Sequence, residues 1–293
     1  MITAPFAYYR ARDVADALEL LAKHGDDAKF LAGGQSLVSM MKLRLVNPAV
    51  LIDLSDVAAL RSIGQADRTL RIGALTSHAD VAGNPLIAEM LPALHDAAGV
   101  IGDPHVRNRG TLGGAAAHGD PAADYPAVLL ALDARITLQS QRGTRVVAAD
   151  EFFLGMFETA LASDELLVDI AFAAAPASAY EKLEHPASGY PVVGAAVRLI
   201  VTGNVIREAR IALTGLGEAA VRVPHVERAL AGVDIAGEGA IAGACSDAAA
   251  NIDIAGDLHA PADYRAAMAD VFTERAVRRA ILRADDLPAR RAR

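Results

Sequence analysis

The sequence predicts an α+β fold in which a mixed region of helices and strands precedes an antiparallel sheet followed by helices. Helical and strand-like patterns alternate over residues 13–172. Three strand-like runs then follow one another with only turn signals between them, and helical patterns fill the remainder. Residues 173–179 are small and include Pro176, so they form the best candidate boundary between the two regions.

The composition describes a folded globular protein and excludes several functions. The chain has 293 residues, 53% of them hydrophobic, and its net charge is −8. This acidic balance argues against a nucleic-acid surface, which needs basic groups to neutralise phosphates. No apolar run is long enough for a membrane span and the N-terminus lacks a signal pattern, so we expect a cytoplasmic protein. The only cysteine, Cys245, excludes an internal disulfide and a four-cysteine iron–sulfur cluster on this chain, and it is expected to be buried.

The first 55 residues predict a small α/β unit. A helical pattern with Asp13 as its N-cap and Gly25 as its stop precedes a short strand, a double glycine and a second helical pattern. A second buried strand follows the break at Pro48. The expected elements are a helix over residues 13–24, a strand over 30–32, a helix from residue 35 and a strand over 50–54.

The double glycine, Gly33–Gly34, is the most informative turn of this unit. Glycine permits positive φ and carries no side chain, so the amide groups of residues 33–36 are able to close around an anion such as a diphosphate. The positive end of the next helix would reinforce them. The alternative is a glycine pair that only makes the bend. The segment is neither a Walker A loop nor a Gly-x-Gly-x-x-Gly fingerprint, and Asp53 is interpreted as a strand-end residue.

The middle of the chain predicts further strands and helices. Thr76 or Ser77 is the expected cap of one helix, and Pro92 is expected to interrupt another. The aromatic cluster at residues 152–157 is interpreted as core. The expected elements are strands over residues 69–74 and 165–172, helices from residue 76, over 85–98 and over 126–132, and a hairpin over 135–147.

A second glycine-rich region, residues 99–126, is expected to be a long irregular connection with a functional role, because it has little apolar bulk. Gly113–Gly114 and the alanines after it let the backbone come close to something flat or extended. Asp120 and Asp124 have two interpretations: they accept hydrogen bonds from hydroxyls of a sugar or polyol, or they are turn and N-cap residues.

Metal binding and covalent catalysis are not expected. His105 and His118 stand at a spacing that matches no standard zinc pattern, and no cysteine accompanies them. No nucleophile motif or other catalytic constellation is present. The sequence therefore predicts no metal ligands and no catalytic residues.

The C-terminal part predicts an antiparallel sheet and helices, with Gly203–Asn204 as a turn between two strands. The basic tail with Arg290, Arg291 and Arg293 is interpreted as a solvated end. The expected elements are strands over residues 179–183, 192–201 and 205–213 and helices over 223–231, 239–250 and 261–283.

Two glycine motifs in this order resemble the FAD-binding medium subunit of molybdenum hydroxylases. They are Ala32–Leu37 and Gly110–Gly114, with Gly119–Asp120–Pro121 after the second. The resemblance covers essentially the whole chain and is closest to the carbon monoxide dehydrogenase flavoprotein within the xanthine dehydrogenase group. Ala115 departs from the family, which often has asparagine there, so one side-chain hydrogen bond is missing.

The resemblance implies a fold and a set of cofactor contacts. The fold is a vanillyl-alcohol-oxidase (PCMH-type) FAD-binding domain over residues 1–175, with subdomains 1–55 and 56–175. A C-terminal domain of three antiparallel strands and a helical bundle follows over 176–293. The implied FAD contacts are Lys29, Leu31, Ala32, Gly33, Gly34, Gln35, Ser36, Leu37, Ile101, Thr111, Gly113, Gly114, Ala115, Ala117, Asp120, Lys182 and Tyr190.

The same resemblance implies an electron-transfer subunit. Noncovalently bound FAD accepts electrons from [2Fe–2S] clusters on a small partner subunit, after a large molybdenum-cofactor subunit has oxidised the substrate, and passes them to an external acceptor. A dimer of heterotrimers is the expected assembly. The alternatives are a self-contained FAD oxidase with its own substrate pocket and a non-catalytic nucleotide-binding subunit.

Overall fold

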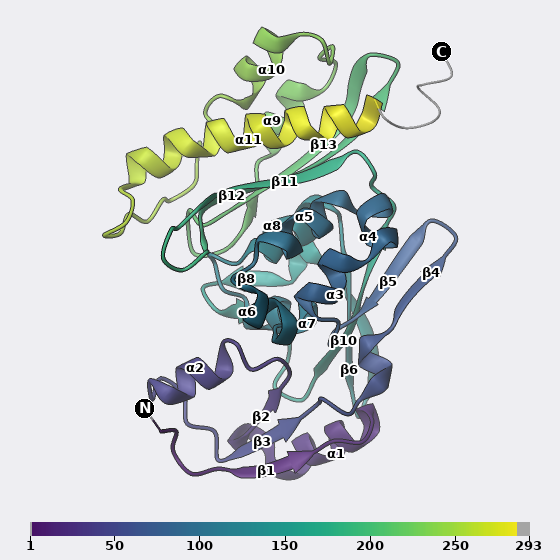
Figure 1. Ribbon diagram of the computed structural model, residues 1–293, viewed down its shortest axis with the longest axis vertical. Helices are drawn as coiled ribbons and strands as arrows, with labels where there is room; N and C mark the ends of the chain where they lie inside the picture. The colour runs from purple at the N-terminus through teal and green to yellow at the C-terminus, as the bar shows by residue number, and fades with distance from the viewer. Residues whose placement is uncertain (1, 286–293) are drawn as a thin grey trace.

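Three large sheets follow one another along the long axis of the molecule (Figure 1). The structure is a computed structural model that describes residues 2–285. The basic tail and the end of the predicted domain 176–293 lie outside the described residues. The α+β prediction is confirmed, because each sheet is accompanied by helices that precede, follow or interrupt its strands.

The first sheet is parallel, in the order β1–β3–β2, and every residue of its central strand is buried. The Asp13 side chain accepts a hydrogen bond from the amide of Asp16, and Gly25 ends the helix at φ 55°, as predicted. Asp53 closes the central strand, also as predicted, and accepts a hydrogen bond from the Tyr8 hydroxyl. The elements are β1 (Ala7–Arg10), α1 (Val14–His24), β2 (Ala28–Leu31), α2 (Leu37–Lys42) and β3 (Val50–Asp53).

The second sheet is antiparallel and has the order β4–β5–β10–β6–β7. The predicted hairpin and the predicted strands 69–74 and 165–172 are confirmed. Its edge strand β4 was not predicted, because most of its side chains are exposed and carry no apolar alternation. The strands are β4 (Ile63–Ala66), β5 (Thr69–Gly73), β6 (Arg135–Ser140), β7 (Gly143–Ala148) and β10 (Leu166–Ala173).

Short helices cover one face of the second sheet and share its core. Ser77 caps the first of them in a capping box with Asp80, and Pro92 begins a new helix after a break, so both predictions are confirmed. The helices are α3 (His78–Gly83), α4 (Pro85–Met90), α5 (Pro92–Val100), α6 (Pro104–Arg109), α7 (Leu112–His118) and α8 (Asp124–Ala131).

The expectation of an irregular connection over residues 99–126 is wrong, because this region contains α6 and α7. Asp103 accepts a hydrogen bond from the amide of Val106 and so caps α6, whose first residue is proline. Thr111 caps α7 through the amide of Gly114. The small residues of α7 do not prevent a helix: they allow a short one to pack closely against its neighbours.

The interpretation of residues 152–157 as core is correct only in part. Phe152 is fully buried, but Met156 and Phe157 are 57% and 54% exposed. The two exposed side chains lie at the tip of a small hairpin formed by β8 (Phe153–Gly155) and β9 (Glu158–Thr159). A tight turn projects its side chains outward, which a count of aromatic residues does not reveal.

The third sheet, in the order β11–β12–β13–β14, is buried on both faces. Along β12, Ala196 belongs to the core shared with α3–α8, whereas Ala195 and Val197 belong to the core beneath α11. This alternation explains the dense run of small apolar residues in β12. Three strands were predicted, and β14 adds two residues at the edge. The strands are β11 (Ser178–Glu184), β12 (Pro191–Thr202), β13 (Val205–Thr214) and β14 (Val221–Arg222).

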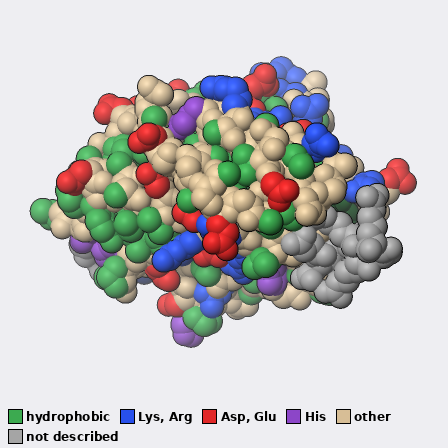
Figure 2. Space-filling view, turned by 90° about the horizontal axis from the view of Figure 1, so that it is seen from above, with side chains coloured by type: hydrophobic (Ala, Val, Ile, Leu, Met, Phe, Trp, Pro, Cys, Tyr) green, Lys and Arg blue, Asp and Glu red, His purple; other side chains and the backbone are tan. Residues whose placement is uncertain are grey.

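The C-terminal helices close the molecule at one end. They are α9 (Pro224–Leu230), α10 (Glu238–Cys245) and α11 (Ala262–Asp285); all three were predicted, although α10 ends at Cys245 and not at residue 250, and Cys245 is buried as expected. The buried Asp96 carboxylate of α5 accepts hydrogen bonds from Arg279 and Arg283, which docks α11 onto the preceding region. Seen from this end, acidic and basic side chains are interspersed (Figure 2). Within residues 2–285, no helix combines the length and apolar character that crossing a bilayer requires.

Candidate functional site

The two glycine-rich turns predicted to bind the cofactor are in direct contact. A Cβ atom on Gly33 would lie 2.0 Å from the carbonyl oxygen of Arg109 and 2.8 Å from the Cα atom of Gly110. A Cβ atom on Gly114 would lie 3.6 Å from that of Ala32. The sequence-based explanation of Gly33, that phosphate approaches where its side chain would be, is therefore incomplete: the position faces the second turn.

A cavity of about 650 Å³ lies where the two turns meet. It runs between the β2–α2 turn, the start of α7 and the β8–β9 hairpin. Twelve of the seventeen predicted cofactor contacts line it. They are Lys29, Ala32, Gly33, Gly34, Gln35, Ser36, Leu37, Thr111, Gly113, Gly114, Ala115 and Ala117.

The first turn presents a run of unused hydrogen-bond donors. In the described part of the chain, no acceptor receives a hydrogen bond from the five consecutive amides of residues 33–37. Gly34 has φ 74°, a left-handed conformation that aims neighbouring amides in a common direction. The amide of Val38, by contrast, donates to the carbonyl of Gly34 at 3.0 Å. Consecutive amides without protein acceptors at the edge of a cavity fit an anionic group such as a diphosphate.

The second turn has no such run of free donors: in the described part of the chain, only Thr111 among residues 110–115 has an amide without an acceptor. The amide of Leu112 donates to Thr76 O at 3.0 Å, and that of Gly113 to Ala74 O at 2.9 Å. The amide of Gly114 donates to the Thr111 hydroxyl at 3.1 Å. A Cβ atom on Gly113 would lie only 2.4 Å from that of Ala74. This turn therefore supplies a closely packed wall, and the amides of Leu112, Gly113 and Gly114 are occupied.

Two histidines that were not among the predicted cofactor contacts also line the cavity. His78 is buried, its Nδ1 atom lies 3.1 Å from the Tyr125 hydroxyl, and burial lowers its pKa to about 4. The ring of His118 packs against Phe157 with centroids 5.0 Å apart, and burial lowers its pKa. Helical spacing from Thr111 through Ala115 to His118 is a signal that would have found this histidine.

One carboxylate on the cavity wall is already paired. Glu165 lines the cavity and accepts a hydrogen bond from Arg145 at 2.6 Å. That hydrogen bond is the main reason why the pKa of Glu165 is lowered. Lys29 stands on the same wall. Within residues 2–285, no three His, Cys, Asp or Glu side chains are grouped so as to hold a metal ion.

Five predicted contacts lie outside the cavity wall: Leu31, Ile101, Asp120, Lys182 and Tyr190. Leu31 packs beside the first turn, where a Cβ atom on Gly34 would lie 3.2 Å from its Cδ1 atom. The Ile101 carbonyl accepts a hydrogen bond from Arg107. The Asp120 carboxylate accepts a hydrogen bond from the amide of Ala122 at 2.9 Å, as in the turn interpretation.

The Lys182 ammonium has protein partners for all three of its N–H donors. They are Asp124 Oδ1 at 3.0 Å, the Val100 carbonyl at 2.8 Å and the Gly189 carbonyl at 2.6 Å. Asp124 is buried and also accepts from the Tyr180 hydroxyl, and burial raises its pKa to about 6. Asp124 is therefore neither an N-cap nor a free acceptor. Lys182 ties the segment that carries the half-exposed Tyr190 to α5.

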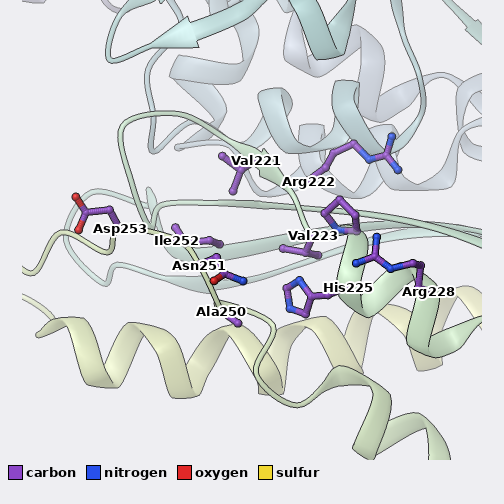
Figure 3. Close-up of a pocket in the computed structure, with 10 residues that line it drawn as sticks. Val221, Arg222, Val223, His225, Arg228, Ala250, Asn251, Ile252 and Asp253 are labelled. Carbon is purple, nitrogen blue, oxygen red and sulfur yellow. The ribbon is translucent and has the colours of Figure 1, made fainter.

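A second cavity, of about 470 Å³, lies in the C-terminal region and contains none of the predicted residues (Figure 3). Arg222 on its wall is paired with Glu227, whose carboxylate lies 2.9 Å from the Arg222 Nε atom. His225 is held through its Nε2 atom by the Asp247 carbonyl at 2.9 Å. The Arg222 guanidinium and the His225 imidazole on this wall therefore both have partners within the protein.

Two protein families match the chain in succession. Residues 4–173 match the family described as the FAD-binding domain in molybdopterin dehydrogenase. Residues 178–280 match the family described as the CO dehydrogenase flavoprotein C-terminal domain. The two matches adjoin at the β10–β11 connection.

Relatives of known activity are similar over nearly their whole length. The carbon monoxide dehydrogenase medium chain of Hydrogenophaga pseudoflava is 41% identical over 280 residues, which is 94% of this chain and 97% of that protein. The 6-hydroxypseudooxynicotine dehydrogenase complex subunit alpha of Paenarthrobacter nicotinovorans is 38% identical, covering 95% of each chain.

Solved structures of such enzymes contain chains of the same fold. A chain of carbon monoxide dehydrogenase from Hydrogenophaga pseudoflava superposes with a TM-score of 0.92 at 41% identity, covering 97% of this chain and 99% of that one. A chain of quinoline 2-oxidoreductase from Pseudomonas putida 86 gives 0.90 at 31% identity, covering 96% and 99%.

Proposed function

This chain belongs to the FAD-binding medium subunits of the molybdopterin dehydrogenases, and we propose that it carries electrons through FAD between a partner subunit and an external acceptor. The resemblance inferred from the two glycine motifs is confirmed. The fold is the FAD-binding domain of this family followed by its flavoprotein C-terminal domain, and the chain is an oxidoreductase subunit with FAD as its cofactor.

The observation that carries the proposal is the run of unused amides on the cavity wall. In a FAD-binding family, donors at residues 33–37 suit the diphosphate, whose charge they would neutralise without side chains. The packed wall made by Thr111, Gly113 and Gly114 suits the flat or extended remainder of the cofactor. When bound, FAD supplies the redox chemistry, while this chain supplies binding and orientation.

Electron transfer, rather than substrate oxidation, is the role proposed for this chain. The sequence motifs include no catalytic constellation, and the one cavity carboxylate of the described site, Glu165, is paired with Arg145. Substrate oxidation would take place at a molybdenum cofactor on a large subunit, and [2Fe–2S] clusters on a small subunit would deliver the electrons. Relatives named as medium chains or complex subunits support this division of labour.

The assembly and domain organisation belong to the same proposal. We propose a dimer of heterotrimers in the cytoplasm. Within this chain we propose a FAD-binding domain over residues 1–175, with subdomains 1–55 and 56–175, and a C-terminal domain from residue 176. In this arrangement Lys182 acts from the second domain, through Asp124 and the carbonyls it binds, on the region next to the cofactor.

Purification from the native source tests the proposal. The chain is expected to co-purify with one larger and one smaller chain, with FAD that is released when the protein is denatured. Flavin that stays attached to the denatured chain, without partner chains, would favour the self-contained oxidase. A colourless preparation that shows no flavin absorbance after reconstitution with FAD would favour the non-catalytic subunit.

A further inference from the structure

The mouth of the cofactor cavity is bordered by exposed apolar side chains from two separate segments. Leu45, just after α2, and Phe157, on the β8–β9 hairpin, both line the cavity and are 70% and 54% exposed. Leu43, Leu154 and Met156 beside them are each more than half exposed. We call these five residues the mouth surface. Large apolar groups concentrated at a site entrance are typical of a surface that another molecule covers.

Both segments of the mouth surface contain a residue in a strained backbone conformation. Arg44 has φ 63° and Phe157 has φ 56°, a region that bulky side chains rarely adopt. Backbone hydrogen bonds hold these turns: the amide of Arg44 donates to Met41 O at 3.2 Å, and that of Phe157 to Gly119 O at 3.1 Å. The fold thus maintains two costly turns that direct apolar side chains outward, as expected where a surface has a function.

The charge on the α2 side of the mouth is positive, although the chain as a whole is acidic and Glu158 follows Phe157 on the other side. Lys42 and Arg44 flank Leu43. Among the described residues neither forms an ion pair, whereas many other basic side chains do, for example Arg12 with Asp16. Unpaired cations around an apolar patch complement a partner that presents apolar side chains with carboxylates beside them.

We propose that the mouth surface, with Lys42 and Arg44, docks the protein subunit that delivers electrons to the cofactor. This inference rests on the function proposed above. The donor must come close to the cofactor, and the mouth surface is continuous with the cavity through Leu45 and Phe157. The matching face of the partner has an apolar centre and acidic side chains that meet Lys42 and Arg44.

The apolar part of the proposal is tested with Leu43→Glu combined with Met156→Glu in the co-expressed complex. Neither residue lines the cavity, so FAD content is expected to remain that of the unaltered chain. Binding of the small subunit is expected to weaken at least about tenfold, because two charges would be buried in an apolar interface. Leu282→Glu, at a 66% exposed position on α11, is the matched control and should leave binding unchanged.

The charged part is tested with Lys42→Gln combined with Arg44→Gln. Affinity of the unaltered chain for the small subunit is expected to fall as salt is raised, and the variant should bind more weakly with a shallower salt dependence. Full binding by both double variants would overturn the docking surface. An unaltered chain that holds no FAD, or no partner chain, would instead overturn the function on which it rests.

Discussion

The two glycine-rich turns have similar sequences but opposite hydrogen bonding. Gly33–Gly34 shortly precedes α2, and Gly113–Gly114 lies in the first turn of α7. In the first turn, the amides of residues 33–37 find no acceptor in the described chain. In the second, the amides of Leu112, Gly113 and Gly114 donate to Thr76, Ala74 and Thr111. The first turn is built to bind, and the second to pack.

The difference shows that a glycine pair predicts a close approach to the backbone, but not whether a ligand or another segment of the protein makes that approach. Gly33 approaches the backbone of Arg109, and Gly113 approaches Ala74, so both glycines are required by contacts within the protein. A phosphate requires consecutive amides without protein acceptors, and in the described chain the first turn has such a run at residues 33–37 whereas the second does not. Three changes test this comparison: one at the contact of Gly33 with Arg109, one in the protonation of His78, and one in the side chain of Gln35.

Gly33→Val should have the largest effect, because it would break the contact between the turns. Its Cβ atom would lie 2.0 Å from the Arg109 carbonyl oxygen, which only backbone movement can relieve. We expect the free energy of unfolding to fall by about 3 kcal/mol or more. FAD should no longer be retained. Denaturant unfolding and flavin absorbance measure the two effects.

The control for this substitution is Gly64→Val on the edge strand β4. A Cβ atom there would meet nothing within 4 Å, and valine is favoured in strands, so stability and FAD content should be kept. If Gly33→Val folded with unchanged stability and full FAD, the contact between the turns would not be essential.

Acid should weaken the second turn through His78, which packs against Gly110. Burial lowers the pKa of His78 to about 4 from its ordinary value of 6.5. Between these values the unfolded chain binds more protons than the folded chain, so stability falls as pH drops through this range. The loss approaches about 3 kcal/mol near pH 4. Unfolding measured from pH 7 to pH 4 should show this slope.

The control replaces the imidazole at two positions. His78→Gln should remove the slope that His78 contributes, whereas His105→Gln, at an exposed position, should preserve it. An unchanged pH profile in His78→Gln would mean that other groups are responsible for the acid sensitivity. The amides of the first turn do not titrate, so pH distinguishes the two turns.

Gln35→His should have the smallest effect and sharpens the assignment of the first turn. If the backbone amides hold the diphosphate, the side chain at this exposed position is dispensable, and FAD affinity should change by less than about threefold. Equilibrium titration of the FAD-free protein with FAD measures this affinity. A loss of tenfold or more would mean that the Gln35 side chain makes the contact.

Much of the fold was predictable because its signals are local. Two helices begin at the N-caps Asp13 and Ser77, and Pro92 separates two further helices. Gly203–Asn204 forms the turn between two strands. Strand β4 and the outward position of Phe157 were not predictable, because exposure depends on what packs nearby. The functions of Lys182 and Asp124 were also hidden, since their partners come from other elements.

The amino-acid sequence was sufficient to locate the two glycine-rich motifs, to predict most helices and strands around them, and to associate the two motifs with FAD. The fold alone determined that Gly33 meets Arg109, that the amides of residues 112–114 are occupied, and that His78, His118 and Phe157 share the cavity. The reason is physical: conformational preferences act between neighbours in sequence, whereas hydrogen-bond partners and burial are set by segments that meet only after folding.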